Sequence, residues 1–379
     1  MRFEFTEEHL MIQKAAREFA QNVLKLGVIE RDNLQKFPKE EIKQLGQLGF
    51  FGMMVDPKYG GGGMDSISYV LAMEEISKVD ASCSVVMSVN NSLVCWGIEN
   101  FGTEEQKQKY LIPLAKGEII GAFCLSEPEA GSDATSQKTS AIDKGDYYLL
   151  NGTKNWITNG NSASVYLVMA QTNPEKGHKG INCLIVEKGA PGFVVGKKED
   201  KLGIRGSDTH SIMFTDVKVP KANRVGEDGF GFKFAMKTLA GGRIGIAAQA
   251  LGIASGAYEL ALAYSKERKA FGKEISKHQI IQFKLAEMAT EIEAARLLCL
   301  KAAWLKDKHQ DYSTASAIAK VFASRVAMEV TIEAVQIHGG SGFVKEYHVE
   351  RLMRDAKITQ IYEGTTEVQK IVISRAVLA

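Results

Sequence analysis

A single block of strand-like sequence lies between two long regions with helical patterns, and this order limits the fold more than any other feature. Within the block, from about residue 119 to Pro220, short apolar runs such as 165–170 and 182–187 are separated by Asn-Gly and Pro-Gly pairs. Short apolar runs with such turn residues between them indicate β-strands. In the run 211–219 the apolar alternation slips by one position, which predicts a β-bulge.

The regions on both sides of this block are predicted to be helical. Near the N-terminus, Thr6 is a candidate helix cap, and apolar residues follow at helical spacing, with a loop at 57–63. After Gly231, long helices are predicted over 232–267, 278–306 and 313–338, ending at Gly339-Gly340, with two shorter helices beyond. We therefore expect an α+β protein with a helical N-terminal domain (1–118), a middle β domain (119–226) and a helical C-terminal domain (227–379). Such an order does not predict an alternating, doubly wound sheet.

Composition excludes several classes of function. The net charge of the 379 residues is +2, and no long basic block marks a nucleic-acid or membrane surface. The longest apolar runs are shorter than the ~20 residues of a membrane helix, and no targeting segment is evident at the start, so we expect a cytoplasmic protein. Five cysteines without C-x-x-C spacing indicate buried, reduced thiols.

Common catalytic motifs are absent from the sequence. The glycines at 60–63 do not complete a dinucleotide-binding G-x-G-x-x-G, and no P-loop, H-E-x-x-H or G-x-S-x-G sequence occurs. We expect no metal site.

Three stretches together indicate a family: FCLSEPEAGSD at 123–133, ERKAFG at 267–272 and RDAKITQIYEGT at 354–365. In this order they resemble the acyl-CoA dehydrogenase family over essentially the whole chain, and RIGIAAQ at 243–249 is most similar to the short-chain, butyryl-type members. The resemblance implies a middle β-barrel-like domain, a C-terminal four-helix bundle, FAD bound without a Rossmann fold, and a homotetramer (a dimer of dimers).

The resemblance also implies a reaction. A base removes the α proton of an acyl-CoA thioester while the β hydrogen leaves as hydride to flavin N5, and an electron-transfer flavoprotein receives the electrons. Abstraction of so weakly acidic a proton requires a carboxylate in contact with it, little solvent, and hydrogen bonds to the thioester carbonyl.

Glu363 matches the catalytic base of the family. On the residues alone, a Glu between two helices indicates an exposed, non-catalytic side chain. We expect Ile361 and Tyr362 to cover the carboxylate, Gly364 to allow close approach of a ligand, and Thr366 with Gln369 to form a capping box. Some relatives that act on isovaleryl or long-chain substrates place their base at the position of Gly242, which here cannot act as a base.

The family's FAD contacts fall into two sets. Near the flavin ring we expect Phe123, Leu125, Ser126, Ser132, Trp156 and Thr158, although without the surrounding motif Trp156 would indicate an ordinary core residue of the β domain. Reaching the FAD of a neighbouring subunit we expect Arg268, Phe271, Gln279, Gln336, Gly339 and Gly340, with Thr365 and Glu367 at its other edge. Arg268 suits a pyrophosphate because a guanidinium binds phosphate through two hydrogen bonds, but the residues alone also allow an exposed ion-pair role.

For the acyl-CoA substrate, the family positions are Ser132, Arg243 and Gly364. The chain has Ala240 where the family usually carries Asp, which predicts a weaker or rearranged contact there. Butyryl-CoA is the expected substrate and 2-methyl-branched short acyl-CoA the alternative. An acyl-CoA oxidase is disfavoured by the length of the chain, and a non-catalytic CoA- or flavin-binding scaffold by the presence of Glu363, Thr158 and Arg268 together.

Overall fold

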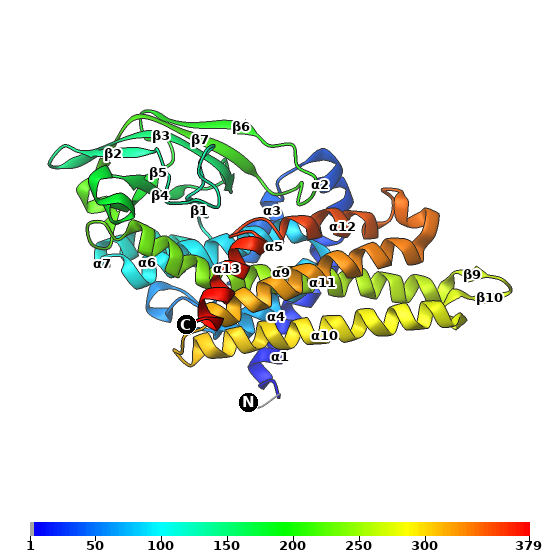
Figure 1. The fold of residues 1–379 in the computed structure, drawn as a ribbon. Helices are drawn as coiled ribbons and strands as arrows, with labels where there is room; N and C mark the ends of the chain where they lie inside the picture. The colour runs from blue at the N-terminus through cyan, green and yellow to red at the C-terminus, as the bar shows by residue number, and fades with distance from the viewer. Residues whose placement is uncertain (1–3) are drawn as a thin grey trace.

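The N-terminal region of the computed structural model, which describes residues 4–379, is helical (Figure 1). Thr6 caps the first helix by accepting a hydrogen bond from the backbone N–H of His9, as the sequence predicted. The α-helices of this region are α1 (Glu7–Phe19), α2 (Val28–Leu34), α3 (Lys39–Gln47), α4 (Ser66–Val79), α5 (Ala81–Ser88), α6 (Trp96–Phe101), α7 (Glu104–Gln106) and α8 (Ile112–Ala115). The predicted loop at 57–63 contains one 3₁₀ turn, Pro57–Tyr59.

Three π-helical segments interrupt these helices: Ala20–Leu24, Val89–Cys95 and Lys107–Leu111. The second continues α5 into α6, so that Ala81–Phe101 forms one buried helical stretch with a π-bulge. Such bulges are rare and often occur at functional sites.

The middle region is an eight-stranded sheet whose pairing order is β6-β7-β3-β2-β4-β5-β8, with β1 parallel to β4. In Figure 1, β2, β3, β6 and β7 arch over β1, β4 and β5, and an apolar core fills the space between the two layers. The strands are β1 (Gly121–Cys124), β2 (Ser140–Asp143), β3 (Tyr147–Thr158), β4 (Val165–Gln171), β5 (Ile181–Glu187), β6 (Phe193–Lys198), β7 (Thr209–Pro220) and β8 (Arg224–Val225).

The predicted bulge in β7 is confirmed. Leu150 pairs with Val217, but Gly152 pairs with Phe214, so β7 contains one residue more than β3 over this interval. Asp216 takes a positive φ of 51° there, and Asn151 holds it through hydrogen bonds to its backbone and side chain.

The C-terminal region is a bundle of long helices. Its helices are α9 (Gly231–Glu267), α10 (Gln279–Asp307), α11 (Ser313–His338), α12 (His348–Ile358) and α13 (Thr366–Val377). A short hairpin of β9 (Lys269–Ala270) and β10 (Lys273–Glu274) joins α9 to α10 at the far end of the bundle (Figure 1). The central helix α9 packs against α11, α10 and α4, so that it joins the bundle to the N-terminal region.

Two helical stretches correct the expectation that every apolar run is too short to cross a membrane. Ala81–Phe101 and Gly231–Glu267 are both long and apolar enough by length and composition. Within their most apolar windows, however, 94% and 72% of the residues are buried inside the protein. Core helices pass the same test, and this burial identifies both stretches as core helices. All five cysteines are buried and unpaired, as predicted.

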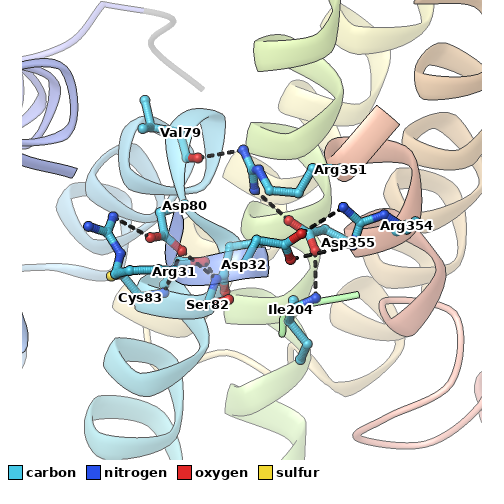
Figure 2. Close-up of polar contacts among 12 residues, drawn as sticks. Arg31, Asp32, Val79, Asp80, Ser82, Cys83, Ile204, Arg351, Arg354 and Asp355 are labelled. Atoms are coloured by element: carbon cyan, nitrogen blue, oxygen red, sulfur yellow. Dashed lines mark hydrogen bonds and ion pairs between the residues drawn. The ribbon is translucent and has the colours of Figure 1, made fainter. Parts of the chain in front are cut away.

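A buried network of charges ties α12 to the other two regions (Figure 2). Arg354 pairs with Asp32 of α2 at 2.7 Å, while Asp355 pairs with Arg351 at 2.5 Å and accepts a hydrogen bond from the backbone N–H of Ile204 in the middle region. Burial raises the pKa of Asp355 to about 6 despite Arg351 beside it. The network therefore fixes the helix that leads directly into the turn containing Glu363.

Candidate active site

Glu363 lies in a strained turn between α12 and α13. Its φ is 52°, and that of Gly364 is 91°, so two successive residues adopt left-handed conformations. A non-glycine residue pays about 1 kcal/mol for this, and such strain persists only where the surroundings enforce it. Gly364 is needed for a second reason, because a Cβ there would lie 2.4 Å from Nε2 of Gln369.

Side chains from two helices hold this turn. Gln369 of α13 donates to the carbonyls of Glu363 (3.2 Å) and Gly364 (2.9 Å). Lys320 of α11 donates to the carbonyls of Thr359 (3.0 Å) and Gly364 (2.8 Å). The turn is therefore fixed at both ends.

The predicted capping box at the start of α13 is wrong. Thr365, one residue earlier, is the cap, and its Oγ1 accepts from the backbone N–H of Val368. Thr366 instead donates to the carbonyl of Gln360, and Gln369 binds the turn carbonyls. The left-handed turn directs these carbonyls inward, so they compete successfully for the amide of Gln369.

The carboxylate of Glu363 lies against the bare backbone of α9. A Cβ on Gly242 would lie 2.1 Å from Oε2 of Glu363 and 2.8 Å from Cδ2 of Leu93, which lies within the π-helical segment Val89–Cys95. Within residues 4–379, Oε2 is buried and has no hydrogen-bond partner. Glycine at 242 thus creates the space that the carboxylate occupies.

Burial raises the pKa of Glu363 to about 7, and the positive charges of Lys320 and Arg243 only partly oppose this effect. A carboxylate without hydrogen bonds in an apolar setting favours its protonated form. A pKa near neutrality is also the range in which a carboxylate acts most effectively as a general base. Glu363 as a whole is half-buried, so the site combines a basic carboxylate with shelter from water for one of its oxygens, Oε2.

The cover over this carboxylate differs from the prediction. Tyr362 points inward and donates its hydroxyl to Oε1 of Gln249, which in turn donates to the carbonyl of Ala81 and to Oγ of Ser84. Ile361, by contrast, is 48% exposed and covers nothing. Glu363, which follows, has a positive φ, and of the two side chains before it only that of Tyr362 points into the core.

Arg243 and Ala240 are neighbours on the buried face of α9. The Nε of Arg243 is buried and has no partner among the described residues. Burial lowers the pKa of Arg243, while Glu363 and Tyr312 favour its charged form. An unpaired, buried guanidinium N–H next to the carboxylate suits an oxygen of an incoming ligand.

The structure brings the ends of β1 and β3 together. Phe123 lies in β1, and Leu125 and Ser126 follow it. The backbone N–H of Asn155 donates to the carbonyl of Ser126, and Lys154 donates to the carbonyl of Leu125. Ser132 lies further along in an exposed loop.

Trp156 is not an ordinary core residue. It is 61% exposed and takes a φ of 61° at a second bulge, where β3 slips against β7 between Lys154 and Ile157. Thr158 is half-buried, and the buried Ile157 separates the two. An indole ring and a hydroxyl are therefore available at the end of the strand, as a planar ligand would require.

The second predicted set gathers at the hairpin end of the bundle. Arg268, Gly339 and Gly340 line one cavity of about 280 Å³, together with Tyr264 and His338. Phe271 at the hairpin tip is 95% exposed. Also exposed are Gln279 and Gln336. In Figure 1 the hairpin end and the β sheet lie at opposite ends of the molecule, so the two sets form two separate sites within one chain.

Thr365 and Glu367, the two residues predicted at the other edge of the FAD, lie next to Glu363 and away from the hairpin. Thr365 caps α13 and is half-buried, and Glu367 is exposed in the first turn of that helix.

Sequence analysis missed Lys320, Gln249 and Lys154. All three are buried polar residues. Lys320 and Lys154 donate to the carbonyls of two predicted site residues, Gly364 and Leu125. Gln249 donates to the carbonyl of Ala81 and accepts from Tyr362, the residue before Glu363. A signal existed for Lys320, which interrupts an otherwise small and apolar stretch, 315–323. A charge in a buried helical stripe indicates a specific partner.

Comparison with known proteins gives the same picture over the whole chain. Models of the acyl-CoA dehydrogenase N-terminal, middle and C-terminal domains match residues 6–118, 122–217 and 229–378. The short-chain specific acyl-CoA dehydrogenase of Clostridium acetobutylicum is 52% identical over 374 residues, with 99% of each chain covered.

Solved structures agree with the sequence relatives. Butyryl-CoA dehydrogenase from Megasphaera elsdenii matches with a TM-score of 0.99 and 51% identity, covering 100% of both chains. A structure described as the electron transferring flavoprotein of Acidaminococcus fermentans, in a study of flavin-based electron bifurcation, also matches at a TM-score of 0.99 with 54% identity and full coverage.

A fold of two helical regions around a sheet, with a buried carboxylate against α9, is that of a flavin-dependent CoA-thioester oxidoreductase. This chain belongs to the acyl-CoA dehydrogenase family and is an FAD-dependent oxidoreductase. Its residues fit that cofactor, because Trp156 and Thr158 offer a ring face and a hydroxyl, and Arg268 beside two glycines suits a diphosphate.

Proposed function

We propose that this protein dehydrogenates short-chain acyl-CoA thioesters of the butyryl-CoA type and passes the electrons to an electron-transfer flavoprotein. The observation that carries the proposal is the buried carboxylate of Glu363, whose pKa is about 7 and which lies against Gly242. Relatives described as short-chain specific and as butyryl-CoA dehydrogenase support the substrate class. The flavoprotein named for a matching structure supports the electron acceptor.

Glu363 is the proposed base, which removes the α proton of the bound thioester. The bound FAD would accept the β hydrogen as hydride. The backbone N–H of Glu363 would stabilise the negative charge that develops on the thioester carbonyl. Arg243, Ser132 and Gly364 would contact the acyl-CoA, with the unpaired Nε of Arg243 as a donor to one of its oxygens.

The FAD contacts are proposed to come from two chains. Phe123, Leu125, Ser126, Ser132, Trp156 and Thr158 of one chain would surround the ring. The partner chain would add Arg268, Phe271, Gln279, Gln336, Gly339 and Gly340, with Thr365 and Glu367 at the remaining edge. The separation of the two sets within one chain supports this arrangement, and we propose a homotetramer, a dimer of dimers.

We also propose domain boundaries after residues 118 and 226, and the change from helices to strands and back to helices near these positions supports them. A cytoplasmic location is proposed because several of the relatives are bacterial enzymes.

The test is an anaerobic titration of the purified yellow protein with straight-chain acyl-CoAs from C4 to C12, and with isobutyryl- and 2-methylbutyryl-CoA. Loss of the oxidised flavin absorbance should be most complete and fastest with the C4 thioester. Preference for 2-methylbutyryl-CoA would replace butyryl-CoA by the branched substrate. If no thioester reduces the bound flavin, the protein is a binding scaffold and the proposal is wrong.

A further inference from the structure

Lys320 is a buried lysine that contacts the turn containing Glu363 directly. It lies on α11 and is 1% exposed, among the buried residues Ala317, Ala319 and Ala323. Burial of an ammonium group is costly unless hydrogen bonds compensate it. Here the two compensating bonds go to the carbonyls of Thr359 and Gly364.

We infer that Lys320 is a positioning residue for the base: its ammonium group clamps both ends of segment 359–364 and thereby fixes where the Glu363 carboxylate lies. The inference rests on the proposed role of Glu363. Thr359 is the C-cap residue of α12, and Gly364 directly follows the base. One cationic group therefore spans the whole turn.

Among the residues that the structure describes, the other side chains that donate to backbone carbonyls of the turn belong to α13: Thr366 donates to the carbonyl of Gln360. Gln369 also binds the carbonyls of Glu363 and Gly364, but it belongs to α13, the helix that the turn itself begins. Lys320 belongs to α11, which packs against α9, where Gly242 receives the carboxylate. The lysine therefore links the turn to the part of the bundle against which the carboxylate rests.

The same ammonium group also acts through its charge. Lys320 lowers the pKa of Glu363, and burial lowers the pKa of Lys320 itself to about 8 while Glu363 raises it. The other charged or titratable groups that face this pair are Arg243 of α9, Tyr69 of α4, Tyr362 of the turn and Glu367 of α13. Of these, only Arg243 brings a second positive charge to the carboxylate.

The experiment compares Lys320→Met, Lys320→Gln and Lys320→Arg with the wild-type holoenzyme. The first readout needs no substrate: the infrared band of the protonated Glu363 carboxyl, identified by its loss in Glu363→Gln, is titrated with pH. The second is the single-turnover rate of flavin reduction by butyryl-CoA, and the third is the thermal unfolding midpoint. Lys306→Met is the matched control, since burial also lowers the pKa of Lys306 to about 8, but its amine contacts Sδ of Met54.

We expect Lys320→Met and Lys320→Gln to shift the carboxyl titration upward by about one pH unit, the usual effect of removing one nearby opposite charge. The flavin reduction rate at pH 7 should fall by about tenfold or more, because fewer molecules carry the ionised base and the carboxylate is held less firmly. Lys320→Arg keeps the charge and should shift the titration less than half as far. Lys306→Met should leave both readouts at wild-type values.

A purely structural role for Lys320 would lower only the unfolding midpoint, and unchanged titration and reduction rate in both neutral variants would overturn the inference. Failure of wild-type protein to react with any thioester is a different result. That outcome would refute the proposed function, while the infrared titration would still measure the coupling between Lys320 and Glu363.

Discussion

At the turn between α12 and α13, a single chain supplies the carboxylate, the space for it and the donors that hold it. At the hairpin end, Phe271 is 95% exposed and Arg268 lines an open cavity. The base is thus completed within the chain, whereas the hairpin end offers its residues outward. Changes at the turn should therefore affect the chemical step, and changes at the hairpin end should affect retention of the cofactor and assembly.

The largest effect is expected for Glu363→Gln, which keeps the shape of the side chain but cannot accept the proton. The single-turnover rate of flavin reduction by butyryl-CoA should fall by about 10³-fold, within the range known for loss of a general base. The purified variant should retain its FAD. An unchanged reduction rate would remove Glu363 from the role of base.

Gly242→Ala tests the space that the carboxylate occupies. The new methyl group would lie 2.1 Å from Oε2 of Glu363, so the carboxylate must move. We expect the reduction rate to fall by about 10- to 100-fold, as a displacement near 1 Å commonly causes. Gly241→Ala is the control, since the nearest atom to its new Cβ is the hydroxyl of Tyr312 at 3.8 Å. Equal rates in the two variants would contradict this geometry.

At the hairpin end, Arg268→Ala should weaken FAD binding by about 10- to 100-fold, the loss expected for charged hydrogen bonds to a phosphate. FAD content after gel filtration and the mass from light scattering measure this effect. With FAD in excess, the reduction rate should remain within a few-fold of wild type. Lys269→Ala is the neighbouring control. If Arg268→Ala reduces its flavin much more slowly than wild type even when FAD is fully bound, the hairpin end also affects the chemical step, and the contrast with the turn at Glu363 is wrong.

The smallest effect concerns stability. The pKa of Glu363 rises from 4.5 in the unfolded chain to about 7 in the folded protein, so the folded state binds this proton more tightly. Its contribution is favourable at low pH and is lost as pH rises from about 4.5 through 7. Glu363→Gln should therefore raise the unfolding temperature relative to wild type at pH 8, by roughly 1–3 °C, and less at pH 5. The exposed Glu346→Gln should show no such pH-dependent difference.

The sequence predicted the elements better than the contacts between them. Helix ends were predictable at Thr6 and Gly339 because caps are local signals, and the β7 bulge was predictable from a slip in alternation. The exposure of Trp156 was not, because it depends on a positive φ at a bulge that leaves the residue pattern unchanged.

The contacts around Glu363 could not be predicted from the sequence either. Lys320 and Gln249 reach the turn from 44 and 113 residues away along the chain, and no local pattern encodes such contacts. The family resemblance assigned the base, but only the structure shows why its pKa is raised and that Gly242 makes room for it. The cap at Thr365 was misplaced by one residue because two adjacent threonines are chemically equivalent candidates.

The most direct test of this account is the pH dependence of anaerobic flavin reduction by butyryl-CoA in the wild-type protein, measured in single turnovers from pH 5 to 9 at substrate concentrations below saturation, where the rate reports the pKa of the free protein. A buried base whose pKa is about 7 predicts a rate that rises with pH through a midpoint near 7, and that rise should be absent in Glu363→Gln. A rate that is flat over this range, or that has already reached its plateau at pH 5.5, would mean that the Glu363 carboxylate is not the buried base described above.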